Sequence, residues 1–191
     1  MVTNARPLHS APFAIPLADL LRELAGVVGQ LTAAQYNAPA GESFFRGTIG
    51  GHVRHCLDHA RALLDTIDSG VIDYDARDRG TRIELDPGAA RDEIHRLRTL
   101  AESAAQKSPD LTVFVRVLPT RDGAPVQLRS TLGRELGFVL SHTIHHNAMI
   151  RGMAMAMGIG LPQSFGYAPS TLAHQTMCQS RAASGECACA H

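Results

Sequence analysis

The sequence has no tryptophan, few other aromatic residues and no net charge. Aromatic residues make up 5% of the chain, and 18 Lys and Arg residues balance 18 Asp and Glu residues. Proteins that bind nucleic acids usually present a basic face, and docking on an anionic membrane also needs clustered positive charge. The composition therefore argues against a nucleic-acid-binding or membrane-surface protein.

Long apolar runs are also missing. The longest apolar stretch, 148–161, is interrupted by Arg151 and three glycines, and it is shorter than the roughly 20 residues that a membrane-spanning helix needs. Arg6, His9 and several prolines break up the N-terminal segment, which lacks the charged-then-apolar layout of a secretory signal. We therefore expect a cytoplasmic location.

Cysteine is scarce, and its spacing is not that of a disulfide framework. Of the four cysteines, Cys178, Cys187 and Cys189 lie in the last fourteen residues, whereas Cys56 lies in an apolar stripe and is expected to be a small core residue. Cys187, Cys189 and His191 form a C-x-C-x-H pattern of metal-ligating types, but the spacing matches no established metal-site template. The small and polar composition of 176–191 predicts a disordered tail.

Apolar residues at helical spacing predict four helices, at about 16–36, 48–69, 87–106 and 131–157. Ser130 precedes the fourth as a candidate cap, Asp86 and Pro87 open the third, and Gly158 ends the last. Residues 71–85 are interpreted as an irregular connection, and 111–118 with 126–128 as a short β-hairpin. The prediction is an all-α four-helix bundle over 16–175 with a long crossover, preceded by a flexible arm at 1–15.

The last predicted helix contains three histidines, two of which face its apolar side. At 100° per residue, His142 and His146 lie within about 80° of the centre of the apolar stripe, whereas His145 lies about 140° away. Residues four apart are neighbours on a helix, so the two inward imidazoles can converge on one ion. Metal binding would offset the cost of burying two imidazoles. The alternative is a pair of core histidines bonded to other polar groups.

The predicted helix at 48–69 also contains three histidines, His52, His55 and His59. The same angular estimate favours His52 or His59 over His55 as the inward residue, and all three stay open on this ground. Asp58 and Glu135 are candidate carboxylate partners or an extra ligand. The alternative for both is ordinary charge on a helix surface.

At these residues the sequence resembles the DinB/YfiT-like family of metalloenzymes. The resemblance covers about 16–172 and rests on four segments: IGGHVRHCLDHARALL, IDYDARDRGTRIE, GRELGFVLSHTIHHNAMI and FGYAPSTL. It implies a four-helix bundle whose metal is held by one histidine of the second helix and by the H-x-x-x-H pair of the fourth. Carried over, these ligands are His55, His142 and His146, because the family pattern around the first ligand falls on 53–58.

The resemblance also implies a class of chemistry. The metal would be a divalent transition ion (zinc, nickel, iron or manganese), and relatives use it with a low-molecular-weight thiol as co-substrate. A thiol transferase or a hydrolase acting on a small molecule is therefore expected. Asn147 and Ala148 stand where the sulfoxide synthases of this superfamily continue with H-x-E, which argues against their oxygen-dependent reaction.

Two other interpretations compete with a metalloenzyme. One is a non-catalytic metal-binding protein of the stress response, and the other is a structural helical module without metal. Bundles of this kind often pair, so a homodimer is compatible with the sequence, although no exposed apolar stripe demonstrates one.

Overall fold

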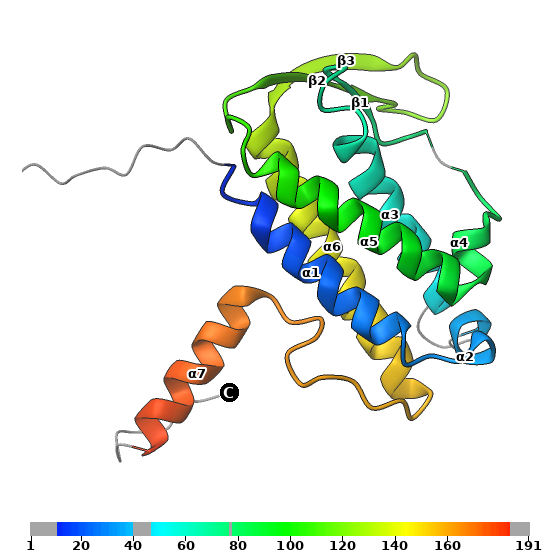
Figure 1. Ribbon diagram of the computed structural model, residues 1–191, viewed down its shortest axis with the longest axis vertical. Coiled ribbons are helices and arrows are strands. Elements are labelled where there is room, and N and C mark those ends of the chain that lie inside the picture. Colours follow the sequence, from blue (N-terminus) through cyan, green and yellow to red (C-terminus); the bar gives the residue numbers. More distant parts are fainter. Residues whose placement is uncertain (1–10, 40–46, 77, 184–191) are drawn as a thin grey trace, which may run out of the picture.

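Four long helices surround the core of this protein (Figure 1). The computed structural model describes residues 11–39, 47–76 and 78–183. The long helices are α1 (Ala14–Val28), α3 (Ile49–Leu64), α5 (Pro87–Ala104) and α6 (Leu132–Ala156). Helix α1 packs on α5 and α6, and α3 packs on the same two helices, so each has two neighbours around a shared apolar interior. The mostly helical architecture agrees with the prediction from periodicity.

The first predicted helix is divided in two, which corrects the expectation of one helix over 16–36. Helix α1 starts at Ala14, inside the expected arm, and ends at Val28, and a short helix, α2, follows at Ala33–Asn37. The Thr32 hydroxyl accepts a hydrogen bond from the Gln35 amide, and the Gln35 side chain accepts one from the Thr32 amide. This reciprocal capping box starts a new helix, and periodicity alone did not reveal it.

A three-stranded sheet lies beyond one end of the long helices (Figure 1). Strand β2 (Thr112–Val117) pairs antiparallel with β3 (Val126–Thr131) and parallel with β1 (Val71–Asp73). Strand β1 and the one-turn helix α4 (Arg82–Leu85) both lie in the stretch 71–85, so the interpretation of that stretch as irregular was wrong. A three-residue strand is too short to show a period, and its partner is far away in the sequence.

The start of α6 lies one residue later than expected. Thr131 is the N-cap, and its hydroxyl accepts a hydrogen bond from the Arg134 amide. Ser130 belongs to β3 instead, and its hydroxyl donates to Glu135. The far end agrees with the prediction, because the helix stops before Gly158, whose φ of +71° favours glycine.

Helix α7 (Pro169–Ala183) stands apart from the four long helices (Figure 1). Residues 176–183 are helical where a disordered tail was expected, whereas Cys187, Cys189 and His191 lie outside the described residues, as do residues 1–10 of the expected arm. No helix in the described part of the chain combines the length and apolar character that crossing a membrane requires.

The N-terminal turn of α3 is covered by α2 and α4. The Tyr36 hydroxyl donates to the Ile83 carbonyl (2.8 Å), and the Asn37 amide group donates to the Leu85 carbonyl (2.8 Å). Only glycine fits at position 50, because a Cβ there would overlap the Glu84 carbonyl oxygen and lie 2.6 Å from Tyr36 Cε1. This close approach fixes α4 beside the part of α3 that carries the histidines.

Candidate metal centre

Helices α3 and α6 pack against each other and bring their histidines together. At their contact the buried Cys56 thiol donates to the Thr143 hydroxyl (3.5 Å), which in turn donates to the Val139 carbonyl of its own helix (2.8 Å). As the angular estimate predicted, His146 is buried and His142 is half-buried, whereas His145 is exposed. The α6 pair therefore faces α3.

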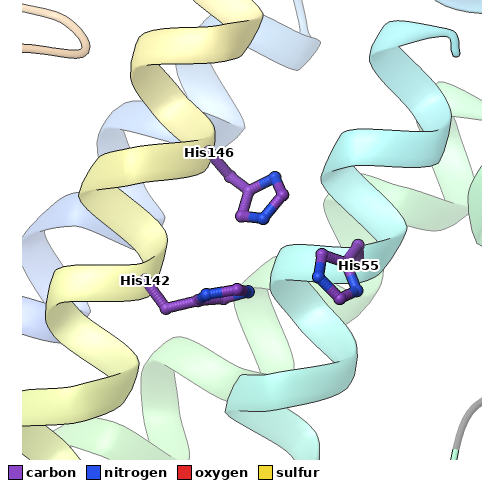
Figure 2. A group of neighbouring side chains, drawn as sticks. All are labelled: His55, His142 and His146. Atoms are coloured by element: carbon purple, nitrogen blue, oxygen red, sulfur yellow. The ribbon is translucent and has the colours of Figure 1, made fainter. Parts of the chain in front are cut away.

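Three of the histidines form a compact group across this interface. One ring nitrogen from each of His55, His142 and His146 lies within 4.8 Å of the other two. The ring centroids are 5.0 Å apart for His55 and His142, 4.7 Å for His55 and His146, and 4.5 Å for His142 and His146. Figure 2 shows His142 and His146 projecting from α6 into the space where His55 projects from α3. A group of this kind could hold a metal ion.

The donor set fits a divalent transition metal. Burial and then the neighbouring histidines, His142 first, lower the pKa of His146 from 6.5 to about 3. A neutral imidazole has a lone pair for a metal, whereas a protonated one has none. The side chain thus stays in its metal-binding form near neutral pH, and imidazole is a ligand that suits zinc, nickel and iron.

The other two histidines of α3 lie on either side of the group. His52 Nδ1 is 3.1 Å from His146 Nδ1, so the N–H of one ring donates a hydrogen bond to the other ring's nitrogen. His59 Nδ1 donates to the His55 carbonyl (3.0 Å), and its ring stacks on His142 with centroids 3.9 Å apart. Both residues contact members of the group, and both are placed to fix the orientation of those rings.

The two candidate carboxylates are occupied elsewhere, and neither joins the three-histidine group. Asp58 is buried and accepts from Arg54 (2.6 Å); burial raises its pKa and the Arg54 charge opposes that rise. Glu135 is fully buried and accepts hydrogen bonds from three side chains. These are Tyr74 (2.9 Å), Ser130 (2.5 Å) and Arg134 (2.7 Å). Because Asp58 and Glu135 are both buried, the alternative of ordinary charge on a helix surface is wrong. Glu135 links the sheet to α6, and Asp58 forms an ion pair with Arg54.

The cysteines in the described ranges are not part of this group. Cys56 is fully buried, and burial raises the pKa of its thiol to about 11, as expected for a core residue. Cys178 lies on α7 with its sulfur 3.5 Å from His174 Nε2.

A cavity of about 390 Å³, open to solvent, lies beside the histidines. His55 and His146 line it together with His52. Its charged lining residues are Arg54, Arg79 and Glu84. None of these three was predicted. Arg79 and Glu84 lie in the stretch interpreted as irregular, where no period indicates which side chains face inward.

Comparison with known proteins agrees with the geometry. A family model described as the DinB superfamily matches residues 17–150. The chain is also 36% identical over 105 residues to a protein called FK506-binding protein 5 from Rhizopus delemar (strain RA 99-880), a match that covers 54% of this chain. The chain spans only 27% of the length of that relative.

The family match covers both the α3 and the α6 histidines. It includes the long helices α3 and α5 completely, and α1 and α6 except for their outer ends, so it spans the interface where the histidine group lies. The resemblance seen in the sequence is thereby confirmed, and the chain belongs to the DinB superfamily.

Proposed function

We propose that this protein is a divalent-metal-dependent enzyme acting on a small molecule, with His55, His142 and His146 as the metal ligands. The observation that carries the proposal is that this group adjoins a solvent-open cavity, since His55 and His146 belong to both. Among the residues that the structure describes, the group contains no fourth donor. Three protein ligands leave a coordination position for a substrate, as catalytic zinc sites do.

A thiol transferase is the preferred reaction class, and a hydrolase is second. A bound divalent ion would lower the pKa of a thiol or of water and so supply a nucleophile near neutral pH. The side chains of this protein would position the metal ligands. His52 and His59 hold the rings of His146 and His142 through the contacts described above. The buried Cys56 thiol is excluded as the nucleophile, so the thiol would enter as a co-substrate through the cavity.

The test is turnover of a small electrophile with and without a thiol. Natively purified protein would be assayed with 1-chloro-2,4-dinitrobenzene plus cysteine for transfer, and with 4-nitrophenyl acetate for hydrolysis. We expect a rate that a chelator abolishes and zinc restores, that His55→Ala removes, and that the control His145→Ala retains. Full activity after complete removal of metal would contradict the proposal.

One observation favours a second candidate, a non-catalytic metal-binding protein. His52 and His59 lie so close to His146 and His142 that either could close the coordination of a bound ion. A closed site would bind metal without reacting. This candidate predicts stoichiometric metal, no turnover with either probe, and metal affinity that falls in His52→Ala or His59→Ala as much as in His55→Ala.

A further inference from the structure

The cavity beside the histidines has a polar wall with an uneven distribution of charge. It is lined by the first two turns of α3 and the residues just before them, by α4, by the loop before α4 and by His146 of α6. A volume of about 390 Å³ is near the lower end of the range for ligand pockets, which is roughly 300–1,000 Å³. The cavity therefore fits a small molecule, and its charged residues indicate which kind.

Two of the three charged residues already neutralise each other. Arg54 Nε lies 3.0 Å from Glu84 Oε2, and Arg54 NH1 lies 2.6 Å from Asp58. The Arg54 side chain is 12% exposed, so these ion pairs are largely shielded from water. Arg54 and Glu84 thus form part of the wall and leave no excess charge to attract a ligand.

Arg79 is different. The Gly80 amide donates to Glu84 Oε2 (3.1 Å), which holds the loop against α4, and the φ of Gly80 is +68°. The adjacent Arg79 lines the cavity, and the structure records no hydrogen bond or ion pair for its guanidinium within 11–39, 47–76 and 78–183. A guanidinium with open donors can pair with a carboxylate through two parallel hydrogen bonds.

The proposed metal centre would add a second positive charge beside the cavity, because His55 and His146 also line it. Its three ligands are imidazoles and include no carboxylate, so a divalent ion bound there would keep its full charge. A molecule in the cavity would then meet the charge of the metal as well as that of Arg79. A single guanidinium suits a planar, singly charged group better than a phosphate, which usually takes several donors.

We propose that this cavity binds a small carboxylate, with Arg79 pairing its carboxylate group and the rest of the molecule directed toward His55 and His146. The part of this proposal that concerns the end of the molecule near His55 and His146 rests on the proposed function. The contact between Arg79 and the carboxylate does not require a metal. The ligand class is then a small organic acid that has its reactive group a few bonds from the carboxylate.

Butyrate and its uncharged amide, butyramide, are a suitable pair of probes. Their binding to zinc-loaded and to chelator-treated protein would be titrated by ligand-observed NMR for the wild type, Arg79→Gln, Arg79→Lys and the control Arg121→Gln. Arg121 is exposed like Arg79 but lies in the β2–β3 connection and does not line the cavity. We expect butyrate but not butyramide to bind, about tenfold weaker binding in Arg79→Gln, partial recovery in Arg79→Lys, and no change in Arg121→Gln.

Equal butyrate affinity in the wild type and Arg79→Gln would overturn the inference, and so would equal binding of acid and amide or tighter binding of inorganic phosphate. The zinc content of each variant separates this result from the proposed function. Arg79→Gln that holds zinc but loses butyrate supports both proposals. A wild type that holds none of zinc, nickel, iron and manganese refutes the metalloenzyme alone, because butyrate binding by the wild type and by Arg79→Gln can still be compared on the metal-free protein.

Discussion

Gly50 offers the sharpest test of how the fold builds the wall of the cavity. It lies in the first turn of α3, where a Cβ would overlap the Glu84 carbonyl oxygen and lie 2.6 Å from Tyr36 Cε1. The Glu84 oxygen belongs to backbone, so Gly50→Ala must displace α4 or α2. Overpacking of this kind costs about 1–3 kcal/mol of unfolding free energy, which for a domain of this size lowers Tm by roughly 2–12 °C.

The matched control is Gly26→Ala in α1, where nothing lies within 4 Å of the added Cβ. Glycine inside a helix is less favourable than alanine by roughly 0.5–1 kcal/mol, so the control should be more stable than the wild type by about that amount. Urea unfolding and differential scanning calorimetry would measure both variants. If Gly50→Ala is as stable as Gly26→Ala, then α4 does not contact α3 as described and the wall that positions Arg79 is wrong.

Three further predictions concern the histidines and Cys56. His52→Ala should weaken zinc affinity about 10–100-fold through loss of the contact with His146, as measured by competition with a chromogenic chelator; unchanged affinity would remove His52 from the centre. Because burial and neighbouring histidines lower the pKa of His146 from 6.5 to about 3, the unfolded chain binds more protons between these values. The unfolding free energy of the metal-free protein should therefore fall as pH is lowered from 7 to 4, and His146→Ala should reduce this slope; urea midpoints at several pH values that do not move would refute it. The buried Cys56 thiol, whose pKa is raised to about 11, should resist iodoacetamide at pH 8 until denaturant is added, as mass spectrometry of the labelled peptide would show, whereas rapid labelling of the native protein would contradict its burial.

Periodicity predicted the helical part of the fold because long amphipathic segments repeat their signal over several turns. The apolar stripes of α3, α5 and α6 and the cap Asp86 could all be predicted from the sequence. The short elements could not be predicted in this way. Strand β1 and helix α4 are too brief to show a period, and the break between α1 and α2 depends on the Thr32–Gln35 side-chain pair rather than on hydrophobicity.

For the candidate site, helical angles gave the inward direction of the α6 pair but not the choice among the α3 histidines. The angles favoured His52 or His59, and His59 is indeed more buried than His55. However, a buried histidine of α3 need not point toward the histidines of α6. His55 joins the group because α6 crosses α3 at that level, and the angle around one helix cannot show where its neighbour crosses. The family resemblance carried that information.

Metal content shows whether His55, His142 and His146 hold one metal ion. Metal would be quantified by plasma mass spectrometry in natively purified wild type, His55→Ala, the double variant His142→Ala/His146→Ala, and the exposed control His145→Ala. We predict about one equivalent in the wild type and in the control, and loss in His55→Ala and in the double variant with folding retained. Undiminished metal in the double variant, or none in the wild type, would contradict the assignment.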